Sequence, residues 1–126
     1  MKILMSNLDI YQYTSNLANA FNEQENIQLP IMVNFAIQKN LYELSSVVNI
    51  IEKVRNDLGK KYGEYDSAEG NYFIPEENRE KISNELNQLM EAQQNVDIKK
   101  IKLKDLEGIS LTPAQMRSLL FMIEEE

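Results

Sequence analysis

The chain has 126 residues, with no cysteine, no histidine and no tryptophan, and a net charge of −7. This length can bury a core without disulfides or metal, and the missing thiol and imidazole groups exclude a disulfide framework and remove the commonest nucleophile and general base. We therefore predict a non-enzymatic protein with no catalytic residues, no metal and no organic cofactor. Direct nucleic-acid binding is also not expected, because it needs basic surface to displace counterions from phosphates.

The N-terminal part predicts a strand followed by a helix. Residues 1–6 form a short, mostly apolar run that looks like a strand, and Ser6 then offers an N-cap for a helix over residues 8–22. After a polar connector, Pro30 suits the first position of a second helix. No further proline interrupts residues 30–62, so this helix is predicted to be about 50 Å long.

A heptad stripe of apolar residues runs along the predicted long helix. Its members alternate in steps of four and three, with Arg55 at the one polar position: Ile37, Leu41, Leu44, Val48, Ile51, Leu58 and Tyr62. This spacing is typical of a helix packed lengthwise on another helix. A third helix over residues 75–93 is the expected partner, but at about 28 Å it covers only residues 44–62. The first helix, a C-terminal helix or a second subunit must then cover residues 32–41.

The C-terminal part predicts a strand and a last helix. Residues 96–103 are expected to pair with residues 2–5, with a bend or bulge where Lys99 and Lys100 interrupt the alternation. Thr112 then supplies an N-cap, followed by proline and by Gln115 in a capping box. The apolar spacing continues that helix through Ile123.

Together these elements predict a mainly α protein with a small β element. We expect one domain over residues 1–126, built on an antiparallel helical hairpin with a long central helix, two flanking helices and a short two-stranded sheet. The hairpin is expected to project over about residues 44–93.

The connector between the two long helices carries the candidate binding residues. Aromatic residues cluster there: Tyr65, Tyr72 and Phe73. If exposed, they mark a partner site, since aromatic residues are enriched at interfaces. Alternatively, they fold down and cap the end of the helical hairpin.

The same connector has a partial resemblance to a calcium-binding loop. Asp66 and Glu76 match the first position and the glutamate six residues after the glycine, but Ala68 stands where an oxygen ligand is needed. An ion-binding module or an enzyme based on residues 64–76 is therefore the alternative class of function, and an ordinary polar loop is the simpler interpretation.

Acidic residues dominate the third helix. Residues 63–96 have a net charge of −6 and residues 29–62 one of +2. The predicted row of carboxylates consists of Glu76, Glu77, Glu80, Glu85 and Glu91. Such a row can enter a groove meant for nucleic-acid phosphates, with electrostatic steering. Equally, it can simply solvate the outer face and pair with the basic helix.

Three groups of residues carry a resemblance to a known class of proteins. They are Lys39-Asn40-Leu41; Lys61-Tyr62-Gly63-Glu64; and, near the end, Leu103-Lys104-Asp105-Leu106 with Leu111-Thr112 and Phe121-Met122-Ile123-Glu124. Over residues 29–126 the chain resembles small uncharacterised helical proteins of tailed phages and prophages of low-GC Gram-positive bacteria. The resemblance includes no catalytic motif. It implies phage origin, and either inhibition of a host antiviral complex, as anti-CRISPR proteins do, or a virion-assembly or chaperone role.

The expected partner is a protein, bound through Glu76, Glu77, Glu80 and the three aromatic residues. The uncovered half of the long helix also predicts a homodimer. No apolar run approaches the roughly 18 residues that span a membrane, and the start is too short for a signal peptide. The predicted location is the cytoplasm, that of the host cell if the protein is phage-encoded.

Overall fold

The computed structural model describes residues 1–21 and 28–124 and is mainly α with a small β element, as predicted. The helices are α1 (Asn7–Ala20), α2 (Ile31–Tyr62), α3 (Glu76–Glu91) and α4 (Pro113–Leu119), with short 3₁₀ helices at Leu103–Leu106 and Leu120–Met122. The strands form antiparallel pairs β1 (Lys2–Ser6) with β4 (Gln93–Asp97) and β2 (Glu64–Asp66) with β3 (Asn71–Phe73), and a parallel pair β5 (Ile101–Lys102) with β6 (Ile123–Glu124).

The helix starts follow their local signals. The Ser6 hydroxyl accepts the Asp9 N–H at 3.1 Å, and Thr112 and Gln115 form a reciprocal capping box. One end differs from the prediction, because α4 stops at Leu119 instead of continuing through Ile123. A 3₁₀ helix continues the chain over Leu120–Met122, and Ile123 then joins β6, where it pairs with Ile101.

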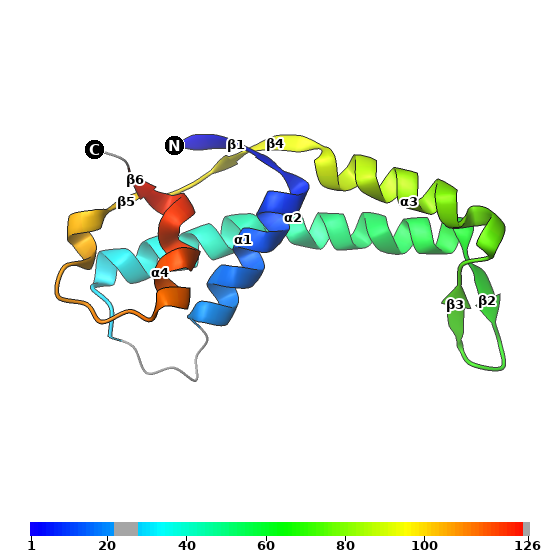
Figure 1. Ribbon diagram of the computed structural model, residues 1–126, viewed down its shortest axis with the longest axis horizontal. Coiled ribbons are helices and arrows are strands. Elements are labelled where there is room, and N and C mark those ends of the chain that lie inside the picture. Colours follow the sequence, from blue (N-terminus) through cyan, green and yellow to red (C-terminus); the bar gives the residue numbers. More distant parts are fainter. Residues whose placement is uncertain (22–27, 125–126) are drawn as a thin grey trace.

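The molecule consists of a body and an arm (Figure 1). The body contains α1, α4, the N-terminal half of α2 and the β1–β4 and β5–β6 pairs. The arm is the C-terminal half of α2 with α3 alongside it, and the β2–β3 pair projects from its far end. The core lies in the body, and its largest fully buried side chains include Ile10, Leu17, Ile37, Leu44, Ile98, Leu119 and Met122.

The heptad stripe is covered within one chain. Helix α1 packs on α2, and Val33, Ala36 and Ile37 are buried in a core that they share with residues of α1, α4 and the 3₁₀ helix Leu120–Met122. Elements of the same chain therefore cover the buried face of residues 32–41, which removes this reason to expect a second subunit, and the homodimer itself stays a prediction. In the arm, α3 lies on Ile51, which is buried.

The arm is thinly packed. No residue of α3 is fully buried; Leu86 and its apolar neighbours on the inner face are only half-buried. Apart from its contacts with α1 at the body, α3 packs on α2 alone, so most of its length has one neighbour and cannot bury a wide stripe. Its junction with the body is polar: the Asn7 side-chain amide donates to the Leu89 carbonyl at 2.7 Å, and the Gln94 amide donates to the Asn7 side-chain oxygen.

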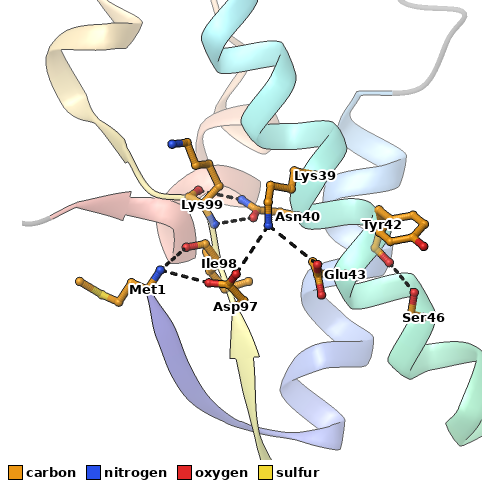
Figure 2. Close-up of polar contacts among 9 residues, drawn as sticks. All are labelled: Met1, Lys39, Asn40, Tyr42, Glu43, Ser46, Asp97, Ile98 and Lys99. Carbon is orange, nitrogen blue, oxygen red and sulfur yellow. Dashed lines mark hydrogen bonds and ion pairs between the residues drawn. The ribbon is translucent and has the colours of Figure 1, made fainter.

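The predicted strand over residues 96–103 is interrupted, as the phase break indicated. β4 ends at Asp97 and pairs with β1 as expected, while β5 pairs with β6, a pairing that the sequence did not indicate. Asn40, buried on α2, bridges the interruption (Figure 2). Its amide nitrogen donates to the Lys99 carbonyl at 3.0 Å, and its side-chain oxygen accepts the Lys99 N–H at 2.8 Å.

The chain start lies beside the two hydrogen bonds between Asn40 and Lys99, which we call the Asn40 clamp (Figure 2). The Met1 amine donates to the Asp97 carboxylate and to the Ile98 carbonyl, both at 3.2 Å, and Lys39 lies 3.7 Å from the same carboxylate. The Met1 amine first, and then the Lys39 charge, hold the pKa of the exposed Asp97 carboxyl below its ordinary value of 3.8.

Candidate protein-binding site

The connector between α2 and α3 forms a two-stranded β-ribbon, β2–β3, at the end of the arm. Tyr65 pairs with Tyr72 across the ribbon. The Asp66 carboxylate organises the turn by accepting the Ala68 N–H at 2.9 Å, and Gly70 closes it at φ +74°, in the left-handed region that glycine tolerates. The sequence suggested only a connector here, because three-residue strands are too short to show an alternation.

The ribbon displays its aromatic side chains. Tyr65 is 59% exposed, Tyr72 51% and Phe73 48%. The two tyrosine rings pack edge to face with centroids 5.3 Å apart, a favourable aromatic geometry. The alternative interpretation, in which these residues fold down to cap the helical hairpin, is therefore wrong. By the alternation of strands, the tyrosines share one face of the ribbon and Phe73 lies on the other.

The base of the ribbon is tightly constrained. Gly63 ends α2 by donating its N–H to the Gly59 carbonyl, and a Cβ at Gly63 would overlap that oxygen and lie 3.1 Å from the Phe73 carbonyl. The Asn78 side chain ties the start of α3 to the Tyr62 carbonyl at 2.9 Å. These contacts set the direction in which the ribbon leaves the arm.

The predicted acidic row is only partly assembled. Glu76, Glu77 and Glu80 are exposed on the first turns of α3, and no ion pair within the described residues involves them. Glu85 departs from the row: it faces α2, where its Oε1 lies 3.5 Å from the Lys61 ammonium. Spacing along α3 explains this, because Glu76 and Glu80 are one turn apart on the outer face and Glu85 shares the inner face with Leu86.

The Lys61–Glu85 contact is the one ion pair between α2 and α3 that the described part of the chain shows. The interaction with Tyr62 first, and then the Glu85 charge, raise the pKa of Lys61 above its ordinary value of 10.5. The expected pairing of charges between α2 and α3 is therefore confined to this point, and the outer acidic side chains remain available to a partner.

The aromatic and acidic candidates share one end of the arm but lie on different sides of it. In Figure 1 the ribbon projects from one side of α2, and α3 runs along the other. Residues 64–80, which include both sets, contain six acids and one arginine, a net charge of −5. The whole tip is thus strongly acidic, with aromatic side chains on the strands of the projecting ribbon.

The calcium-loop interpretation can be compared with the observed turn. Asp66, its first ligand position, accepts two backbone N–H groups of its own turn, from Ala68 and Glu69, on one carboxylate oxygen. Across residues 1–21 and 28–124, no three acidic side chains gather into a group that could hold a metal ion.

No protein-family model matches the chain, and comparisons with curated proteins and with solved structures find no match either. Within the described residues, none of the helices combines the length and the apolar character needed to cross a bilayer. The candidate site must therefore be interpreted from its own geometry.

Proposed function

We propose that the protein acts without catalysis, by binding another protein through the tip of its arm. The observation that carries this proposal is the half-exposed Tyr65–Tyr72 pair on a ribbon that extends away from the core. Leaving two aromatic rings in water forfeits the stabilisation that burial would give. Rings of this kind are typical anchors of protein interfaces.

The charge of the tip defines the kind of partner. A net charge of −5 over residues 64–80 favours a basic surface, such as a groove that normally receives nucleic-acid phosphates. The form of the proposal that fits best is inhibition of a host antiviral complex by occupation of its nucleic-acid groove. A virion-assembly or chaperone role is the second form, since an exposed aromatic ribbon also suits docking on a capsid or tail subunit.

The test is capture of partners from lysates of uninfected and phage-infected host cells, with the tagged protein as bait. We expect a nucleic-acid-binding defence protein to be recovered. Tyr65→Ala with Tyr72→Ala should abolish recovery. Glu76→Lys with Glu80→Lys should slow association and flatten its salt dependence, because steering between opposite charges is screened by salt. Leu120→Ala, which removes an exposed large apolar side chain of the body, is the control and should leave recovery unchanged.

Other outcomes would redirect the proposal. Recovery of only capsid or tail subunits would favour the assembly role. Recovery that is unchanged by both the tyrosine and the glutamate variants would exclude the arm tip as the binding site. Micromolar calcium or magnesium binding by calorimetry, abolished by Asp66→Ala, would favour the ion-binding alternative.

A further inference from the structure

Helix α2 presents a second heptad strip, on the side away from the core. Its members alternate in steps of four and three: Ile31, Phe35, Gln38, Tyr42, Ser45 and Asn49. We call this set the uncharged strip. Ile31 is 82% exposed, Phe35 51% and Tyr42 74%. Large apolar and aromatic side chains therefore face solvent at the spacing by which helices pair.

The strip lies opposite the buried face of the helix. At about 100° per residue, Val33 and Leu44 point about 200° away from Ile31 and Tyr42, and both are buried. Helices α1 and α3 pack on that buried side, so the strip is left without a covering element among the described residues. The Ser46 hydroxyl at its edge donates to the Tyr42 carbonyl at 2.9 Å, so this polar group is satisfied within the helix itself (Figure 2).

The absence of charge sets this strip apart from the rest of the surface. Charged residues make up 26% of the chain, and solvated helix faces usually carry them at a higher frequency. The same side of α2 becomes charged beyond the strip, at Glu52, Lys53 and Lys60. The strip is thus neutral over about 27 Å and ends where charges begin.

We propose that the uncharged strip pairs with the same strip of a second copy, with the two α2 helices antiparallel. The order of side-chain sizes supports this arrangement, because the large residues lie in the N-terminal half and the small ones, Ser45 and Ser46, in the C-terminal half. A two-fold axis near the middle of the strip brings Phe35 of each copy onto these serines. Tyr42 then meets Gln38, where a phenol and an amide can form a hydrogen bond twice.

Charge supports a second copy in this orientation. The chain carries −7, so two copies repel each other unless their contact is neutral and their acidic regions are far apart. The strip is neutral, and antiparallel pairing sends the two acidic arm tips to opposite ends of the dimer. A face about 27 Å long and 10 Å wide covers about 270 Å², a third of the roughly 800 Å² per partner of a standard interface, so we expect weak, transient association with a dissociation constant in the high micromolar range.

The first test is sedimentation equilibrium from low to high micromolar concentration. The mass should rise from 14.7 kDa toward twice that value. Phe35→Glu should raise the dissociation constant by about tenfold or more, because it places an unpaired charge in the contact. Ile50→Glu, at a similarly exposed apolar position on another face of α2, should leave it unchanged. A constant mass of 14.7 kDa, or equal effects of the two variants, would overturn the proposal.

The second test uses the absence of native cysteine. Phe35→Cys and Ser46→Cys chains, mixed and mildly oxidised, should form mixed 35–46 disulfides in preference to 35–35 or 46–46 disulfides. Both positions are exposed, so the variants should fold. Predominant 35–35 and 46–46 disulfides would indicate parallel helices and overturn the arrangement.

Discussion

Removing the Asn40 side chain tests how the body holds its interrupted strand. Asn40→Ala deletes both hydrogen bonds to the Lys99 backbone, at 3.0 and 2.8 Å. Each bond contributes about 0.5–1.5 kcal/mol, and each partner left unsatisfied in a buried site adds about 1–3 kcal/mol. Because the Lys99 end is only partly buried, water can reach it, and we expect a total loss of about 2–4 kcal/mol in the free energy of unfolding.

Urea unfolding followed by circular dichroism measures this loss, provided that the m-value is unchanged. Asn40→Asp separates the two bonds, because it keeps the acceptor for the Lys99 N–H and replaces the donor with an oxygen that repels the Lys99 carbonyl. It should also destabilise, as it buries a charge. Asn34→Ala, an exposed asparagine on the same helix, is the matched control and should stay within about 0.5 kcal/mol. A loss below about 0.5 kcal/mol for Asn40→Ala would refute the clamp.

Three further predictions concern stability. Ile51→Ala should cost about 2–4 kcal/mol by urea unfolding, and Leu86→Ala clearly less, since Leu86 is only half-buried; equal losses would contradict the thin packing of the arm. The lowered pKa of Asp97 stabilises the fold at pH values above the pKa of Asp97 in the unfolded chain, and this contribution is lost as the pH falls through the pKa in the folded protein. Asp97→Asn should therefore weaken the dependence of unfolding on acid below about pH 4. An unchanged dependence would argue against the Met1 contact. Amide hydrogens of α3 should exchange with solvent faster than those of α1, which packs in the core, and equal protection of the two helices by mass spectrometry would show that the arm does not open independently.

The sequence by itself determined the helices and most of their ends. Ser6, Pro30 and Thr112 act within one turn of their own position, so their effect on the backbone can be inferred without the rest of the molecule. The heptad stripe identified the buried face of α2 because that face follows from periodicity alone. The aromatic candidates could be named because their residue type and their proximity in sequence place them on one connector.

Only the tertiary structure decided how these elements meet. Periodicity shows that a face is buried but not which element covers it, so the sequence left open whether elements of the chain itself or a second subunit cover residues 32–41. The Asn40 clamp joins residues 59 positions apart, and β5 pairs with a strand that the helical spacing of its residues had hidden. The exposure of Tyr65 and Tyr72, and the departure of Glu85 from the acidic row, depend on the direction in which the ribbon and α3 leave the end of α2. Such directions arise from contacts between different elements, which no pattern within one element specifies.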